Sequence, residues 1–117
     1  MTTHTSAATR PWQVLPLTGD VDLGSAPALR QRLSELTEEA PSFLVIDLTD
    51  LDFIDSTGLG VLVGTLRRVR AAGGDVRLAA PRSGIARVFS VTGLDRVFSL
   101  YPTVDDAKKD EEQPPAL

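Results

Sequence analysis

A serine stands at the expected start of a helix, in the run DSTGLG at residues 55–60. The mostly apolar residues 43–54 before it indicate a strand, and residues 59–69 after it have helical periodicity. The first amide groups of a helix lack intrahelical acceptors, and the helix dipole favours negative charge there. A phosphoryl group on the Ser56 hydroxyl would be received by such amides. The run therefore predicts a phosphorylatable serine. The alternative is a plain helix cap, from Asp55 or Ser56, worth about 1 kcal/mol.

Three glycines in the first half of this helix, Gly58, Gly60 and Gly64, require a reason, because each costs roughly 0.5–1 kcal/mol relative to alanine. At 100° per residue, Ser56, Gly60, Gly64 and Arg67 share one face. The neighbouring face is apolar and should meet a sheet: Leu59, Leu62, Val63, Leu66 and Val69. The glycines either permit close packing of helix on sheet or allow another protein's backbone to approach Ser56. The pattern leaves both explanations open.

Acidic residues gather in the segments expected beside this serine. If residues 19–22 lie at the same end of the sheet as Asp55, an acidic rim surrounds the site, formed by Asp20, Asp22, Asp50 and Asp52. Taken singly, each is an ordinary solvated loop residue, but as a set they predict a partner with basic residues. Arg67 and Arg68 are candidates to pair with a phosphate on Ser56, and are equally well explained as solvated helix residues.

The residues needed for catalysis are scarce. The chain has one histidine, His4, and no cysteine, so neither a Ser-His-Asp arrangement nor a thiolate metal site is expected. Phosphate-binding and dinucleotide fingerprints are absent from the sequence. Asp50, Asp52 and Asp55 are better explained by turn chemistry than by metal binding. We expect no enzyme activity, no metal and no cofactor.

Composition limits the partners. The 117 residues carry a net charge of −4, with a pI of about 4.8. An acidic chain is not expected to bind nucleic acid or an anionic membrane surface. No apolar stretch approaches the ~18 residues of a transmembrane helix. The N-terminus has no apolar signal region. These features predict a single-domain cytoplasmic protein with no membrane contact.

The elements that must position the site alternate along the chain. Residues 1–11 and 108–117 are expected to be a disordered arm and a disordered acidic, proline-rich tail. Between them, strands are expected at 12–17, 43–54, 76–79 and 97–100, with a turn-like interruption at 50–52. Helices are expected from Ser25 to about 40, 57–72, 83–93 and after Thr103. The alternation predicts an α/β fold whose mostly parallel or mixed sheet has four or five strands and about four helices. Pro16 suggests an edge strand, and Gly19-Asp20 a turn that could close a hairpin.

The whole folded part, residues 12–107, resembles a known family. The motifs that carry the resemblance are DSTGLG at 55–60, preceded by VIDL at 45–48 and LDFI at 51–54, with LTGDVD at 17–22 and GGDVRL at 73–78. They resemble the STAS domain of bacterial anti-sigma-factor antagonists. The resemblance implies one STAS-like α/β domain, with a mixed four- to five-stranded sheet packed against about four helices.

The resemblance also implies partner switching. An unphosphorylated antagonist of this family binds an anti-sigma factor that is also a serine kinase, and so releases a sigma factor. The kinase phosphorylates the serine that corresponds to Ser56, and a serine phosphatase reverses the modification. The residues implied in partner binding are Asp22, Asp55, Ser56, Thr57, Gly58, Leu59, Gly60 and Gly64.

Two other functions remain open. The chain can instead be a STAS subunit of another signalling or transport assembly, which would not need a kinase to act on Ser56. It can also be a nucleotide or small-anion binder that uses the start of the helix at Thr57.

Overall fold

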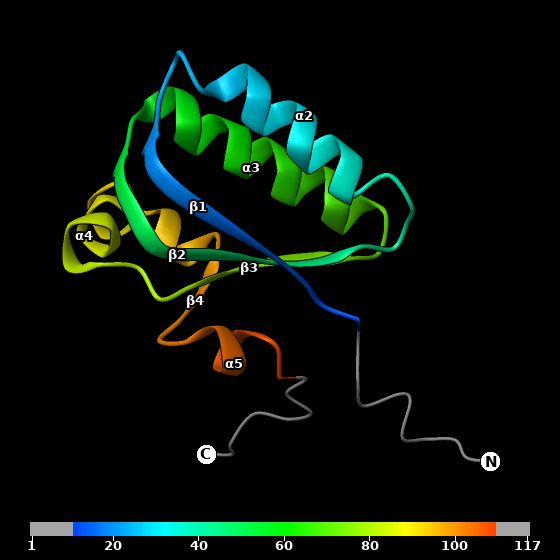
Figure 1. Ribbon diagram of the computed structural model, residues 1–117. Coiled ribbons are helices and arrows are strands. Elements are labelled where there is room, and N and C mark those ends of the chain that lie inside the picture. Colours follow the sequence, from blue (N-terminus) through cyan, green and yellow to red (C-terminus); the bar gives the residue numbers. More distant parts are fainter. Residues whose placement is uncertain (1–10, 110–117) are drawn as a thin grey trace.

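The computed structural model describes residues 11–109 (Figure 1). Along the chain, the strands are β1 (Gln13–Val21), β2 (Phe43–Ile54), β3 (Asp75–Ala79) and β4 (Ser99–Tyr101). The helices are α2 (Ala26–Leu36), α3 (Ser56–Ala71), α4 (Ser83–Val91) and α5 (Val104–Ala107), with one 3₁₀ turn, η1 (Leu94–Arg96). His4, most of the predicted arm and most of the predicted tail lie outside the described residues.

The four strands form one sheet in the order β1-β2-β3-β4, and every neighbouring pair is parallel. The α/β class and the helical crossovers are thus confirmed, whereas the mixed sheet and the hairpin are wrong for the described part. Gly19 adopts a left-handed conformation (φ 69°), but the chain does not reverse there. Instead, β1 continues to Val21 and pairs with β2, so the glycine lies at an irregularity of the strand. Pro16 is on an edge strand, as predicted, where a missing N–H is tolerated.

β2 is much longer than β3 and extends beyond it. β3 pairs only with residues 43–47 of β2, and the remainder of β2 pairs with β1 alone. Shifts in the β1–β2 register accommodate the extra residues of β2, including the predicted turn at 50–52, which lies within the strand. The result is a two-stranded extension that carries the end of β2, and hence the start of α3, away from the rest of the sheet.

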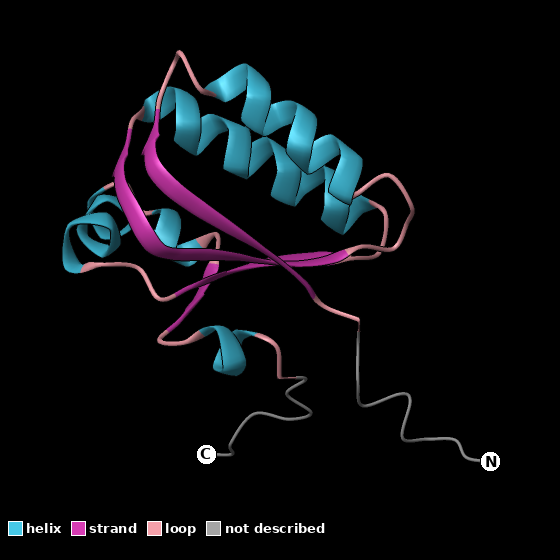
Figure 2. Cartoon of the chain, viewed as in Figure 1, coloured by secondary structure: helices cyan, strands magenta, loops and turns pink. Residues whose placement is uncertain are grey.

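Helices α2 and α3 cover one face of the sheet, and α5 lies on the other face (Figures 1 and 2). The main core lies between the sheet and α2, α3 and α4. The predicted apolar stripe of α3 is confirmed there: Leu59, Leu62, Leu66 and Val69 are buried, and Val63 is partly buried. The buried residues of the other two helices are Leu29 and Leu33 of α2 and Ile85 and Phe89 of α4. Full burial of each such side chain stabilises the fold by roughly 1.5–3 kcal/mol.

The end of α3 follows directly from its sequence. Gly73 has φ 89°, and its N–H donates to the Arg70 carbonyl at 3.0 Å. The Gly74 N–H donates to the Val69 carbonyl at 2.9 Å. This pair of bonds is a Schellman motif, which satisfies carbonyls that the helix end would leave free. The predicted end of this helix at residue 72 is confirmed to within one residue, because α3 ends at Ala71.

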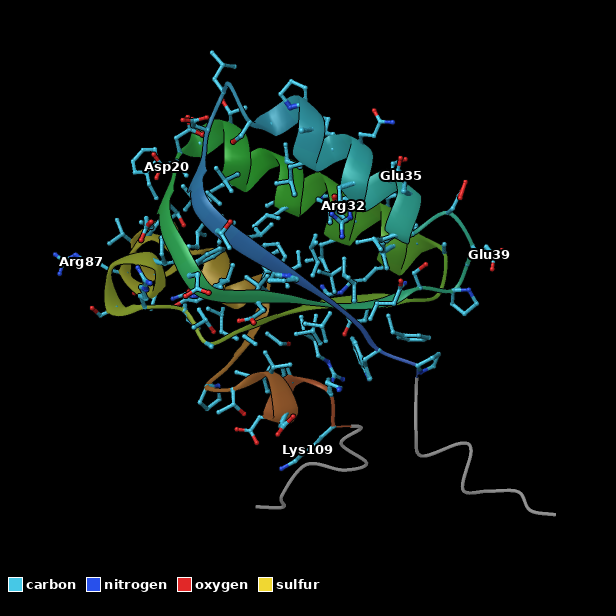
Figure 3. All side chains as sticks on the ribbon, in the orientation of Figure 1. Asp20, Arg32, Glu35, Glu39, Arg87 and Lys109 are labelled. Atoms are coloured by element: carbon cyan, nitrogen blue, oxygen red, sulfur yellow. The ribbon has the colours of Figure 1, made fainter. Side chains whose placement is uncertain are left out.

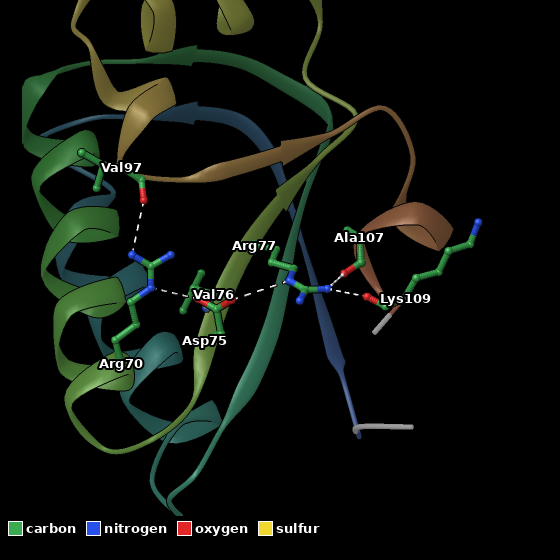
Figure 4. A network of polar contacts seen from close by, with 7 residues as sticks. All are labelled: Arg70, Asp75, Val76, Arg77, Val97, Ala107 and Lys109. Atoms are coloured by element: carbon green, nitrogen blue, oxygen red, sulfur yellow. Dashed lines mark hydrogen bonds and ion pairs between the residues drawn. The ribbon is translucent and has the colours of Figure 1, made fainter. Parts of the chain in front are cut away.

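The short helix α5 is held on the second face of the sheet by Arg77 of β3. The Arg77 guanidinium lies 4.3 Å from the centroid of the Trp12 ring and 5.4 Å from that of Tyr101. Its Nη1 donates to the backbone carbonyls of Ala107 at 2.9 Å and Lys109 at 2.7 Å (Figure 4). One cation therefore stacks on aromatic rings and binds the carbonyls at the end of α5.

Asp75 extends this network to the first face. Its Oδ1 accepts a hydrogen bond from Arg70 Nε of α3 at 3.0 Å, and its Oδ2 lies 3.6 Å from Arg77 Nε (Figure 4). The start of β3 thus connects α3 on one face of the sheet with α5 on the other.

Candidate functional site

The site lies where β1 and β2 end side by side. Val21 pairs with Ile54, and the Asp55 N–H donates to the Val21 carbonyl at 3.1 Å. The two chain segments then turn outward, one into the loop that leads to α2 and the other into α3. The expectation that Asp22 and Asp55 share one end of the sheet is confirmed, and the reason is the parallel register of their strands.

Asp55, not Ser56, caps α3. Its Oδ1 accepts a hydrogen bond from the Gly58 N–H at 2.9 Å, and its carbonyl accepts one from Leu59 N–H at 2.9 Å. Its backbone is extended (φ −103°, ψ −175°), as is usual for an N-cap residue. The plain-cap explanation thus applies to the aspartate, and the serine is left as the first residue of the helix.

The Ser56 hydroxyl is exposed and unengaged. Among residues 11–109, neither this hydroxyl nor the backbone N–H of Ser56 or Thr57 makes a hydrogen bond with the protein. Thr57 is partly buried, so the serine is the more accessible of the two hydroxyls. Two free amides and an accessible hydroxyl at a helix start can receive a negatively charged group.

The glycines of α3 divide into two kinds. A Cβ on Gly58 would lie 2.7 Å from Val21 Cγ1, 2.8 Å from the Val21 carbonyl oxygen and 2.9 Å from Ile54 Cγ1. Gly58 is therefore required for α3 to pack against the ends of β1 and β2. A Cβ on Gly60 or on Gly64 would have no neighbour within 4 Å, and both residues are exposed.

The packing explanation is therefore confirmed for Gly58, whereas approach of another protein over Gly60 and Gly64 stays a prediction. Gly58 serves packing, while Gly60 and Gly64 leave an open surface that the fold does not need. Gly58 and Leu59, which were expected in the partner-binding surface, are buried and do not belong to the exposed part of it.

Asp22 has an intramolecular role at the start of α2. Its Oδ1 accepts a hydrogen bond from the Ser25 N–H at 3.1 Å, and its own N–H donates to Ser25 Oγ at 3.0 Å. Its carbonyl also accepts from the Ala26 N–H at 2.8 Å. The Ser25 hydroxyl does not cap α2: it faces back to the loop and donates to the Asp20 carbonyl at 3.0 Å. These bonds hold the loop beside Ser56 in one conformation.

The acidic rim is partly neutralised from within the chain. Arg82, just before α4, forms ion pairs with Asp52 and with Asp50, the latter at 3.7 Å. Asp20 is exposed at the end of the sheet where α2 and α3 begin (Figure 3), and no ion pair involves it in the described part of the chain. The sequence could not reveal the Arg82 contacts, because about thirty residues separate the partners.

Arg67 and Arg68 do not belong to the serine site. At about 1.5 Å per residue they lie roughly 17–18 Å along α3 from Ser56, beyond the reach of an arginine side chain. Arg68 Nη2 instead donates to Thr37 Oγ1 at 3.0 Å. The possibility that either arginine pairs with a phosphate on Ser56 is therefore excluded.

Two exposed apolar side chains beside the site were not foreseen. Leu23 of the β1–α2 loop is 73% exposed, and Phe53, next to the buried Ile54, is 49% exposed. Strand alternation could have indicated Phe53, because its neighbour Ile54 faces the core.

Across residues 11–109, no group of three histidine, cysteine or carboxylate side chains is placed to hold a metal ion. None of the helices in that range is long and apolar enough to cross a membrane. The site thus consists of a hydroxyl, free amides, carboxylates and an open helix face, which together suit recognition and modification by another protein.

Known proteins resemble this chain in both sequence and fold. Residues 4–107 match the STAS domain family model. The chain is 39% identical over 84 residues to the anti-sigma-B factor antagonist of Bacillus subtilis, covering 72% of this chain and 76% of that protein. An anti-sigma factor antagonist from Mycobacterium paratuberculosis has a similar structure, with a TM-score of 0.72, 36% identity and coverage of 82% and 81% of the two chains.

The antagonist SpoIIAA is similar in two forms. Its unphosphorylated form gives a TM-score of 0.70 at 27% identity, covering 85% of this chain and 86% of that one. The phosphorylated form of the Bacillus protein gives 0.64 at 26%, covering 85% and 89%. The chain belongs to the STAS-domain family of anti-sigma-factor antagonists.

Proposed function

We propose that this protein binds an anti-sigma factor with serine kinase activity, thereby releasing a sigma factor, and that phosphorylation of Ser56 ends the binding. The observation that carries the proposal is the free, exposed Ser56 hydroxyl at the first position of α3, beside two unengaged amides. The family supports the partner class, and the phosphorylated form of SpoIIAA shows that a protein of this fold accommodates such a group.

The protein supplies the acceptor, and the partner supplies the catalytic groups. Ser56 Oγ attacks the γ-phosphorus of ATP held by the kinase, a new O–P bond forms, and the bond to the β,γ-bridging oxygen breaks to release ADP. The hydroxyl proton passes to a base of the kinase. A serine phosphatase would later direct water at the same phosphorus and restore the hydroxyl.

Phosphorylation changes the docking surface locally. The group adds a charge of about −1.5 to −2 beside Asp20 and Asp22. The helix start stabilises it by roughly 0.3–1 kcal/mol, so α3 has no reason to unfold. Its bulk and charge occupy the surface formed by Ser56, Thr57 and Gly60, and they repel a partner that fitted the unmodified serine.

Intact-mass measurement with the cognate anti-sigma factor and ATP tests the modification. We expect a gain of about 80 Da, one phosphoryl group, in the wild-type protein and in Thr57→Ala, and none in Ser56→Ala. Thr57→Ala is the matched control, since it removes the neighbouring hydroxyl. A gain that persists in Ser56→Ala would refute the site.

Binding of the same anti-sigma factor tests the switch. Ser56→Ala should bind as tightly as the wild type, because the hydroxyl makes no bond that positions the helix. Ser56→Asp should bind at least tenfold more weakly, since a charge then stands in the contact surface. Equal affinities of the two variants would contradict the switch.

A further inference from the structure

A groove of about 840 Å³ lies between α2 and α3 and is lined mostly by exposed residues of the two helices. Its α2 wall includes Arg30 and Glu35, and its α3 wall includes Gly60, Gly64 and Arg68. The side chains of the two helices leave it open to solvent.

Ser56 does not line the groove; it lies about one helical turn before Gly60, the first lining residue of α3. Ser56, Gly60, Gly64 and Arg68 follow one another at intervals of four residues along α3, so they lie in one row. At about 1.5 Å per residue, this row is roughly 18 Å long, the length of a partner helix of about twelve residues. A partner positioned over Ser56 can therefore continue along the groove.

The two arginines of the groove have no carboxylate partner in the described residues. Within residues 11–109, Arg30 makes no hydrogen bond or ion pair, and Arg68 donates only to the Thr37 hydroxyl. Among residues 11–109, Arg70, Arg77 and Arg82 pair with aspartates, and the groove brings together two of the remaining arginines from facing helices. Unpaired guanidinium groups bind carboxylates through charge-assisted hydrogen bonds.

The single acidic side chain of the groove does not neutralise these arginines. Glu35 Oε2 accepts a hydrogen bond from Gln31 Nε2 at 3.4 Å, and it forms no ion pair among residues 11–109. With two arginines against one glutamate, the groove has a net positive charge in an acidic protein. Its complement is a segment with negative charge.

We propose that the groove between α2 and α3 receives an acidic helix of the anti-sigma factor, with carboxylates paired to Arg30 and Arg68. This inference rests on the proposed function. Two parts of the surface then have different roles. Ser56, at one end, is the residue whose phosphorylation ends the binding, and the groove determines which partner binds. Gly60 and Gly64 let the backbone of that helix approach α3 closely.

The chain's own acidic tail is a poor occupant. Residues 110–112 are acidic, but they follow α5, which lies on the opposite face of the sheet from α2 and α3 (Figures 1 and 3). The sheet therefore stands between α5 and the two helices that line the groove.

Charge reversal tests the inference on the full-length, unphosphorylated protein and the purified cognate anti-sigma factor. We expect Arg30→Glu and Arg68→Glu each to weaken binding on the order of tenfold, and Arg30→Gln to weaken it less. The loss should shrink in 0.5 M salt, because screening then suppresses the contact in the wild type too. Arg87→Glu is the control, because this substitution changes the net charge by the same amount as the groove variants Arg30→Glu and Arg68→Glu. Arg87 is exposed on α4, away from the groove (Figure 3).

The outcomes separate this inference from the proposed function. If the groove variants bind like Arg87→Glu while Ser56→Asp still releases the partner, the inference is wrong and the switch stands. If Ser56→Asp has no effect, the switch itself fails. Two other results also overturn the inference. Tighter binding of the anti-sigma factor after removal of residues 110–117 would indicate that the tail occupies the groove. A change in the sedimentation coefficient of the free protein in Arg30→Glu would indicate that a second copy of the chain occupies it. An unchanged melting temperature in Arg30→Glu verifies that folding is intact.

Discussion

Replacing Gly58 by alanine should destabilise the protein, although alanine is the better helix former. The new Cβ would lie under 3.0 Å from three atoms, one of them the backbone oxygen of Val21. That oxygen accepts the Asp55 N–H at 3.1 Å, so it cannot retreat without weakening the bond that joins α3 to β1. The strain therefore falls on the junction of β1, β2 and α3.

The magnitude follows from two opposing terms. Overpacking of a close contact costs about 1–3 kcal/mol. The gain in helix propensity from glycine to alanine returns roughly 0.5–1 kcal/mol. At the centre of both ranges the net loss is about 1.3 kcal/mol, which lowers the melting temperature of a domain of this size by about 5–10 °C.

Gly60→Ala and Gly64→Ala are matched controls in the same helix. A Cβ at either position meets no atom within 4 Å, so only the propensity term applies. Each should raise the free energy of unfolding by about 0.5–1 kcal/mol. Urea and thermal unfolding followed by circular dichroism measure all three variants. The reasoning is refuted if Gly58→Ala is as stable as the wild type, or if the two controls lose as much stability as Gly58→Ala.

Two other substitutions test contacts that the structure assigns. Asp55→Ala removes the side-chain acceptor of the Gly58 N–H and should cost about 1 kcal/mol in urea unfolding, whereas Asp55→Asn should retain most of the stability; equal losses would contradict the cap. Arg77→Ala removes the bonds to the carbonyls at the end of α5, so α5 amides should exchange hydrogen faster and the fluorescence of Trp12, the only tryptophan, should change. Arg70→Ala should leave Trp12 fluorescence unchanged, and the same spectrum for wild type and Arg77→Ala would count against the stack.

The sequence predicted the local features well, because they depend on neighbouring residues. The burial of one stripe of α3 follows from helical periodicity, and its end follows from the left-handed conformation that Gly73 adopts. Pro16 lies on an edge strand because it has no N–H to donate to a second neighbour. The placement of Ser56 at the first position of a helix also needed only the short run around it.

Other features depend on how distant segments meet, and only the tertiary structure decided them. Gly19 looked like the turn of a hairpin, but the pairing of β1 with β2 made the sheet parallel and placed the glycine in a strand irregularity. Glycine is required for packing at Gly58, which faces Val21, but not at Gly60, where a Cβ would meet no atom within 4 Å. No local pattern contains that difference.

The pairing of charged residues also depends on the tertiary structure. From the sequence alone, the amounts of acid and base were known, but not which residues neutralise one another. Arg82 pairs with Asp50 and Asp52 because β2 extends past β3 to lie beside the start of α4. Coulomb interaction depends on separation in space, not along the chain. The position of Ser56 at the start of α3 was therefore determined by sequence. The charge and shape of the surface around it were decided by the packing of strands and helices far apart in the chain.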